Sequence, residues 1–290
     1  MIGKQTVNVI LDWVEQNLEQ RLSIEDVALK SGYSRRNIQS LFKKYVGLPL
    51  GSYIRQRKLC RAATLIRLTP MTMSDISLLL HFCSQQAFCK EFKKLFGCTP
   101  RQYRGRDYWD LTNLHPIWKL NAGALPKFSL ISLKNKKVAG RKLFTSNIYR
   151  ERDDEFVWRR TQLCRNLTQW NKDIICFSGF RASSHCTHVT FVELFSGFEV
   201  KNNLSGTLKI LNCQGGLYAF FHYEGPWKIY ETLPWRIYLE VLPSEGLVRM
   251  DGYDIEYFYF SGTKLNEGSD WVVCDIYIPV RHKSALSGNN

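Results

Sequence analysis

The sequence lacks the patterns that would mark a metal-dependent, secreted or membrane-bound protein. Its nine cysteines form no Cys-x-x-Cys pair and their number is odd, which favours free thiols in a reducing cytoplasm. No apolar run approaches the roughly 20 residues that a membrane span requires, and the start of the chain has no signal-peptide pattern. The stretch "HCTH" at 185–188 has no second ligand cluster at suitable spacing. We therefore expect a cytoplasmic protein with no metal, no other cofactor and no membrane contact.

Basic charge is concentrated in the first part of the chain. Residues 1–110 hold 18 Lys and Arg against 9 Asp and Glu, whereas the remaining 180 residues hold 22 against 17. This asymmetry is expected where one domain meets a polyanion, although a basic face can also be merely solvated. With 290 residues and 44% hydrophobic content, the chain is long enough for two globular domains.

Two basic amphipathic segments repeat each other along the chain. "YSRRNIQSLFKKYVG" at 33–47 and "CSQQAFCKEFKKLFG" at 83–97 match in apolar, basic and glycine positions at an offset of 50. The segments before them, "IEDVA" at 24–28 and "MSDIS" at 73–77, match at an offset of 49, so the second turn has one additional residue. A short helix, a turn and a second helix form the helix-turn-helix pattern, which therefore occurs twice.

A longer helix is predicted between the two copies. "PLGSYIRQRKLCRAATLIRL" predicts a helix from about Leu50 to Leu68, which spans roughly 27 Å at 1.5 Å per residue. Recognition helices at its two ends would lie about one DNA turn apart, roughly 34 Å. One monomer could therefore address two successive major grooves of double-stranded DNA, whereas a palindrome-reading dimer needs one copy per chain.

The end of the second copy, "FKKLFGCTPRQYR" at 92–104, resembles the closing signature of the AraC/XylS transcription regulators. The residues in register include Phe92, Gly97, Thr99, Pro100 and Tyr103. The resemblance implies a sequence-specific, nucleoid-associated transcription activator and not an enzyme. It also implies RNA polymerase as a partner, and target promoters of stress, efflux and antibiotic-resistance genes.

Helical geometry assigns the outward positions of both recognition helices if Ile38, Leu41 and Phe42 pack inward. Arg, Lys and Gln can hydrogen-bond base edges, and Lys and Arg can equally hold phosphates. The candidates for base reading are Arg36, Gln39, Ser40, Gln85, Gln86, Cys89 and Lys90. The candidates for phosphate contact are Lys43, Lys44, Arg55, Lys93, Lys94 and Arg104.

The first recognition helix departs from the family pattern, in which Trp-x-x-Gln-Arg contacts DNA. The matching positions are Arg36, Gln39 and Ser40, so only the glutamine is kept. In the second helix Lys90 stands where the similar regulators have Arg. An Arg can make a bidentate contact to guanine that Ser cannot reach. We therefore expect the first helix to read a shifted or less stringent half-site.

Beyond residue 126 the pattern changes to strands and long helices. The order strand–helix–strand–strand occurs twice, which predicts an α+β domain of two β-α-β-β repeats with internal pseudo-symmetry. This order, with "GGLYAFFHYEGPW", "DIEYF" and "DIYIPV", resembles the GyrI-like effector-binding domain. We predict an all-α DNA-binding domain over 1–107 with two helix-turn-helix motifs, a linker over 108–126 that packs Trp109 and Trp118, the GyrI-like domain over 127–282 and a flexible tail over 283–290.

The second resemblance implies a concave, aromatic-lined sheet surface with a central acidic residue, where small amphipathic or cationic molecules bind. Aromatic walls with one carboxylate favour a cationic amphiphile through cation–π and Coulomb attraction. Each aromatic can instead belong to the core, and the facing of both acidic candidates is open. Alternatively, the domain is a hydrolase, although no nucleophile–base spacing is recognisable, or a protein-interaction platform without a ligand. The effector candidates are Tyr218, Phe220, Glu224, Trp227, Glu256 and Tyr257.

Overall fold

The chain folds into two compact units. The structure, a computed structural model, describes residues 2–115, 124–146, 152–182, 190–200, 208–266 and 269–286. Unit 1 contains residues 2–106 and 113–115, and unit 2 contains residues 107–112 and the described residues from 124 onward. Within these ranges, none of the helices combines the length and the apolarity that a membrane crossing requires.

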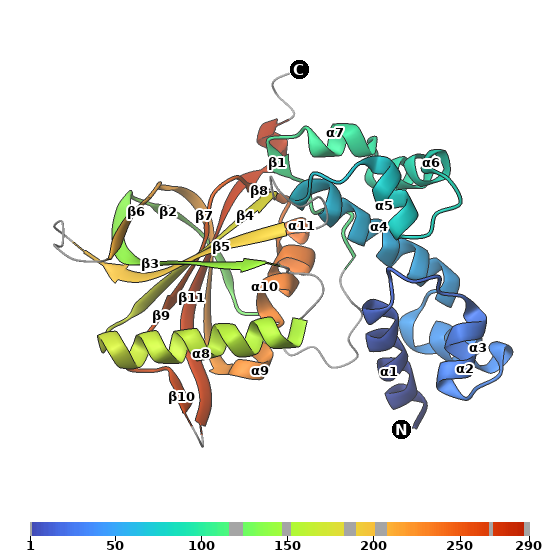
Figure 1. Cartoon of the computed structure of the whole chain (residues 1–290), viewed down its shortest axis with the longest axis horizontal. Coiled ribbons are helices and arrows are strands. Elements are labelled where there is room, and N and C mark those ends of the chain that lie inside the picture. The colour runs from blue at the N-terminus through green and yellow to red at the C-terminus, as the bar shows by residue number, and fades with distance from the viewer. Residues whose placement is uncertain are drawn as a thin grey trace. The chain divides into compact units, whose positions relative to one another are not determined.

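Unit 1 is all-helical and contains the two predicted helix-turn-helix motifs (Figure 1). The long helix between the motifs has the predicted bounds, and a short helix follows the second motif. The helices are α1 Ile2–Gln16, α2 Ile24–Ser31, α3 Arg35–Val46, α4 Leu50–Leu68, α5 Met73–Leu79, α6 Gln85–Phe96 and α7 Pro100–Arg104.

The two motifs begin and end their helices with the same local chemistry. Ser23 before α2 and Thr72 before α5 each form a capping box with the Asp three positions later. Such boxes satisfy backbone N–H groups that have no partner at the start of a helix. Gly47 and Gly97 end α3 and α6 with φ of 81° and 73°, a left-handed conformation that costs glycine little. The repeated sequence therefore produces a repeated structure.

The turn of the second motif is longer than that of the first, as the change of offset predicts. The turns cover residues 32–34 and 80–84. Gly32 has φ of 69° in the first turn, and His81, which stands 49 residues later, has φ of 55°. A side chain in this region is uncommon, because its Cβ approaches a backbone carbonyl oxygen. The His81 Nε2 atom lies 3.2 Å from the carbonyl oxygen of Glu19, a contact that holds the ring in place.

Two basic residues of α4 are buried and bind other parts of unit 1. The guanidinium of Arg57 donates to both carboxylate oxygens of Glu15 on α1, at 2.6 and 2.9 Å, and to the backbone carbonyl of His115. The ammonium of Lys58 donates to the carbonyl of Leu80 at the end of α5 (3.0 Å). Burial lowers the pKa of Lys58. Part of the basic charge of the first hundred residues therefore stabilises the fold.

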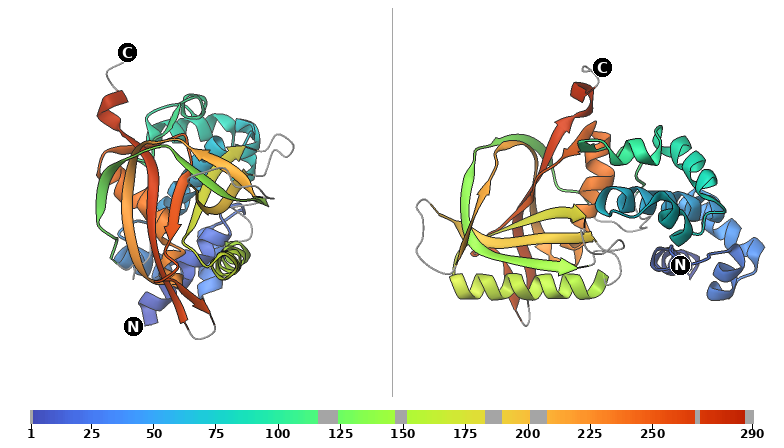
Figure 2. Two further views of the ribbon diagram at one scale, coloured as in Figure 1. Left: turned by 90° about the vertical axis from the view of Figure 1, so that its left-hand side faces the viewer. Right: turned by 45° about the horizontal axis from the view of Figure 1, so that its top comes forward.

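The strands of unit 2 form an antiparallel sheet that curls so that its two edges approach at one corner (Figure 2). β2 lies at one edge beside β7, and β6 lies at the other edge beside β3. Only residues 134–135 separate β2 from β3, and only residues 214–215 separate β6 from β7, so each short connection passes between the edges. The strands are β1 Tyr108–Trp109, β2 Phe128–Leu133, β3 Lys136–Ser146, β4 Ile174–Ala182, β5 Thr190–Glu199, β6 Lys209–Cys213, β7 Gly216–Pro226, β8 Leu247–Met250, β9 Asp254–Phe258, β10 Lys264–Asn266 and β11 Ser269–His282.

The strand order confirms the α+β class and shows the internal pseudo-symmetry. Across the sheet the order is β2-β7-β11-β9 followed by β4-β5-β3-β6, so equivalent strands of the two repeats occupy mirrored places. Each repeat has two strands before its helix, where the sequence predicted one. The reason is the turn at 134–135 or 214–215, after which the chain pairs with a different neighbour. The repeats are therefore β-β-α-β-β.

The helix of the first repeat is continuous and that of the second repeat is broken. α8 covers Arg152–Trp170. The predicted second helix divides into α9 Trp227–Tyr230, α10 Leu233–Arg236, a π-helical segment Ile237–Val241 and α11 Leu242–Ser244. Proline near the start of α10 and of α11 has no N–H to donate, which interrupts the helical hydrogen bonds.

The predicted linker and tail contain ordered structure. β1 pairs with β8, and the ring of Trp109 packs against that of Tyr238 with centroids 6.4 Å apart. Residues 113–115 return to unit 1, where the His115 N–H donates to Cys60 Sγ (3.3 Å). Within the predicted tail, Lys283 begins a 3-10 helix that ends at Leu286, and its Nζ pairs with Asp110 (3.0 Å). Trp118, the "HCTH" stretch and residues 287–290 lie outside the described residues.

Candidate nucleic-acid interface and effector cavity

The recognition helices α3 and α6 bury one face and expose the other. Their hydroxyl N-caps, Ser34 and Ser84, accept hydrogen bonds from the backbone N–H three residues later. The buried apolar residues are Ile38, Phe42 and Val46 in α3, and Phe88, Phe92 and Phe96 in α6, each pair separated by 50 residues. The equal spacing means that equivalent positions face outward in both helices.

The predicted base-reading residues lie on these outer faces, with one exception. The side chain of Cys89 is half-buried, and burial raises the pKa of its thiol. Cys89 lines a shallow recess at the start of α6 together with Ser84, Gln85 and Gln86. The exposed candidates are Arg36, Gln39, Ser40, Gln85, Gln86 and Lys90.

The predicted phosphate-contacting residues are also exposed, apart from Arg104. Its guanidinium donates to the carbonyls of Ile66 (2.9 Å) and Met71 (2.6 Å), and burial lowers its pKa. Arg104 therefore connects α7 to the end of α4, and its contact with phosphate stays a prediction. The exposed candidates are Lys43, Lys44, Arg55, Lys93 and Lys94.

The six effector candidates of unit 2 lie on opposite faces of the sheet. The register pairs Asp275 with both Tyr257 and His222, which places Tyr257 on the same face as Tyr218, Phe220 and Glu224. Glu256 points to the other face, because successive side chains of a strand alternate. Trp227 begins α9 and stacks on Tyr230 (5.0 Å), whose hydroxyl binds Glu256. The structure therefore does not bring these six residues into one site.

The first face has a core of its own and a tyrosine cluster beside it. Tyr218 is buried among residues from several strands, and its hydroxyl donates to the carbonyl of Gln214 (3.1 Å). Tyr257 donates to Asp173 Oδ2 (2.9 Å), and its pKa is raised to about 12 by burial and by this hydrogen bond. Asp275 accepts from the Tyr259 hydroxyl (2.5 Å) and lies 2.6 Å from His222 Nδ1. Tyr218 is therefore a core residue, and its contact with an effector stays a prediction.

The second face carries a buried charge cluster around Glu256. Glu256 is buried, and its carboxylate accepts from the guanidinium of Arg159 on α8 and from the hydroxyl of Tyr230. Burial raises the pKa of Tyr230 well above its ordinary value, so the hydroxyl stays protonated and donates. Glu256 therefore has a counter-ion within the protein.

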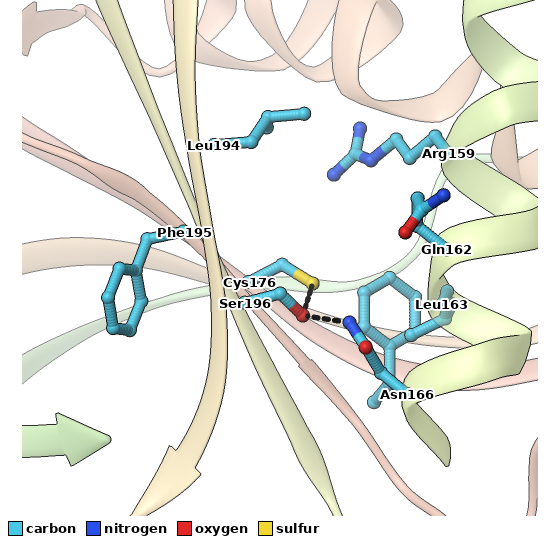
Figure 3. Close-up of a pocket in the computed structure, with 9 residues that line it drawn as sticks. Arg159, Gln162, Leu163, Asn166, Cys176, Leu194, Phe195 and Ser196 are labelled. Carbon is cyan, nitrogen blue, oxygen red and sulfur yellow. Dashed lines mark hydrogen bonds between the residues drawn. The ribbon is translucent and has the colours of Figure 1, made fainter. Parts of the chain in front are cut away.

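A small cavity lies next to this cluster, between α8 and the sheet (Figure 3). Its volume is about 20 Å³, which is room for about one water molecule. Asn166 Nδ2 donates to Ser196 Oγ (2.9 Å), and Cys176 Sγ lies 3.5 Å from the same oxygen. Burial raises the pKa of Cys176, so its thiol remains protonated. The lining residues are Arg159, Gln162, Leu163, Asn166, Cys176, Leu194, Phe195, Ser196 and Phe258.

None of these lining residues was among the effector candidates drawn from the sequence. Arg159, Gln162, Leu163 and Asn166 follow the spacing i, i+3, i+4 and i+7, which places them on one face of α8. That spacing is visible in the sequence and marks the face that packs on the sheet. It does not show which strand lies opposite, and so it could not connect Arg159 with Glu256.

Two protein families match the chain, one in each unit. "Helix-turn-helix domain" matches residues 27–106, and "GyrI-like small molecule binding domain" matches residues 166–281. YkgA of Escherichia coli, named as an HTH-type transcriptional regulator, is 46% identical over 201 residues, which cover 68% of this chain and 83% of that protein. The chain belongs to the AraC-type transcriptional regulators.

The similarity of this AraC-type regulator to known regulators extends through both units. The transcriptional regulator Rob of Salmonella typhimurium is 29% identical over 280 residues, which cover 94% of this chain and 96% of Rob. The HTH-type transcriptional activator AarP of Providencia stuartii is 46% identical over 112 residues, which cover 38% of this chain and 83% of AarP. The regulator is thus similar to Rob over nearly its whole length and to AarP over little more than a third of it.

Proposed function

We propose that this regulator is a sequence-specific transcription activator that binds double-stranded DNA as a monomer, with α3 and α6 in successive major grooves. The observation that carries the proposal is the pair of equivalently capped 12-residue helices joined by α4. The 19 residues of α4 extend over about 27 Å, close to the roughly 34 Å of one DNA turn. The relative AarP is named as a transcriptional activator, which supports the proposal that this regulator activates transcription.

The outer faces of the two helices carry side chains that can hydrogen-bond to the base edges of DNA. Gln39, Gln85 and Gln86 can each make a bidentate contact to adenine, and Lys90 can donate to guanine. Arg36 stands at the start of α3, where an N-terminal residue of a recognition helix meets base edges. Ser40 is short and has one donor, so it lacks the fork of N–H groups by which Arg contacts guanine at two acceptors. The first half-site should therefore carry less information than the second.

Sites selected from a random DNA pool should show this difference between the half-sites. We expect the pool bound by the wild-type protein to be well defined at the half-site of α6 and degenerate at that of α3. Ser40→Arg should restore a preference for guanine in the first half-site, worth about 1–3 kcal/mol, because Arg reaches two acceptors of that base. The wild type and Rob should be compared side by side. If both select the same well-defined first half-site, the result contradicts the hypothesis.

The affinity for DNA should fall steeply with salt concentration. Lys43, Lys44, Arg55, Lys93 and Lys94 are exposed, and each neutralised phosphate contributes about −0.9 to the slope of log K against log salt. Five such contacts predict a slope of about −4.5, and Lys93→Ala should reduce its magnitude by about 0.9. Lys127→Ala, an exposed residue of unit 2, is the matched control and should leave the slope unchanged. Fluorescence anisotropy over a salt series measures both values, and a flat profile argues against these contacts.

The proposal extends to unit 2, which we assign to binding a small amphipathic molecule that modulates unit 1. Its support is the match to a family described as small-molecule binding and the small cavity under α8, which both apolar and polar side chains line. The target promoters are those of stress, efflux and antibiotic-resistance genes, in keeping with the similarity to Rob, and RNA polymerase is the partner.

A further inference from the structure

The cavity under α8 has a carboxylate beside it that is already neutralised. Glu256 accepts hydrogen bonds from Arg159 and Tyr230, and its side chain is 5% exposed. An ammonium group that enters the cavity would lose its hydration and find no uncompensated negative charge in return. A carboxylate that enters would likewise meet a guanidinium whose charge is balanced. Charge therefore does not favour an ionic ligand of either sign.

The cavity also contains amide groups whose hydrogen-bonding capacity is unused. Asn166 is buried, and within the described part of the chain its one hydrogen bond is the bond that it donates to Ser196. The amide of Gln162 lines the same cavity and has no hydrogen bond to a described residue. Figure 3 shows both amides between α8 and the sheet, on the same side as Arg159. An amide in a buried or half-buried place that makes fewer hydrogen bonds than it can is costly, so a ligand that pairs with its remaining groups gains affinity.

We propose that this cavity selects an uncharged amphiphile, whose amide or hydroxyl head group pairs with Asn166 and Gln162 while Arg159 holds Glu256. The inference rests on the proposed effector binding and names the ligand class of that site. Apolar carbon of the ligand would lie against Leu163, Leu194 and Phe258, which line the same space. Since the cavity now holds about 20 Å³, a head group enters only as α8 and the sheet separate.

Calorimetric titration of the full-length protein with three eight-carbon probes tests the selectivity. Octanamide, octylammonium and octanoate share one chain and differ in head-group charge. We expect octanamide to bind the wild type at least tenfold more tightly than either ion. Asn166→Leu should weaken octanamide at least tenfold and leave the weak binding of the ions unchanged, because it removes the amide that would pair with the head group and nearly keeps the side-chain volume.

Variants of the Arg159–Glu256 pair distinguish the electrostatic role of Arg159 from its contribution to packing. Arg159→Met exposes the Glu256 carboxylate to the cavity, so octylammonium should gain at least tenfold while octanamide changes little. In the double variant Arg159→Met/Glu256→Gln no charge remains, and the gain of octylammonium should disappear. The double variant also tests the proposal if Arg159→Met alone fails to fold. Arg160→Met is the matched control, since Arg160 pairs with Asp270 at the surface and not with Glu256.

Two results would overturn the proposal in different ways. If octylammonium binds the wild type as tightly as octanamide, the cavity does not select an uncharged ligand. The proposed effector binding by unit 2 is then kept. If none of the three probes binds any variant, and the protein used still binds DNA, the result contradicts both the assignment of the cavity and the proposed effector binding.

Discussion

Replacing Arg57 by Met should lower the free energy of unfolding of unit 1 by about 3–5 kcal/mol. The substitution leaves the carboxylate of Glu15 buried without its counter-ion, and an unpaired buried charge costs far more than the pair contributes. Both side chains are 10% exposed, and the Tyr53 hydroxyl also donates to Glu15 (3.1 Å). The loss should appear as an earlier urea transition in the helical circular dichroism signal. The bond from Arg57 to the His115 carbonyl disappears in the same variant.

Two further variants identify the cause of that loss. Glu15→Met/Arg57→Met removes both charges and should recover most of the stability, because apolar side chains of similar volume can replace a buried pair. Arg61→Met is the matched control one helical turn later. Its pair with Glu19 (2.7 Å) is more exposed, at 17% and 24%, so we expect a loss of about 1 kcal/mol or less. Equal losses for Arg57→Met and Arg61→Met would show that burial of the pair is not decisive.

Local chemistry made unit 1 predictable from the sequence. The helix starts at Ser34 and Ser84 and the ends at Gly47 and Gly97 depend on residues within one turn of the chain. The repeat then allowed each copy to confirm the other. What the sequence could not show is which cations are structural. Arg57 is buried and Arg55 is exposed on the same helix, and only the packing of α1 against α4 distinguishes them.

Long-range pairing decides most of unit 2, and there the sequence was less informative. The turns at 134–135 and 214–215 resemble hairpin turns, yet the strands that they connect pair with strands of the other repeat. Alternation along β9 alone implies that Glu256 and Tyr257 face opposite sides of the sheet, so they could not share one site. The contact between Arg159 and Glu256 joins residues 97 positions apart, and only the folded sheet brings them together.

Insertion of five base pairs between the two half-sites should reduce the affinity at least about 100-fold. The insertion rotates one half-site by about half a helical turn, so α3 and α6 can no longer enter both grooves from one face of the DNA. Each lost base-pair contact costs about 1–3 kcal/mol, and a half-site comprises several. The affinity should therefore match that of a duplex in which one half-site is scrambled, which is the matched control. Gel-shift titrations at one salt concentration make the comparison.

Insertion of ten base pairs distinguishes binding by one rigid monomer from binding by two protein molecules. It returns both half-sites to the same face of the DNA but adds about 34 Å between them. The continuous helix α4, with 19 residues and about 27 Å of length, cannot extend to cover that distance. We therefore expect the ten-pair duplex to bind as weakly as the five-pair duplex. Recovered affinity would indicate two protein molecules, each of which reads one half-site, and a 2:1 stoichiometry in analytical ultracentrifugation would confirm that reading against the proposed monomer.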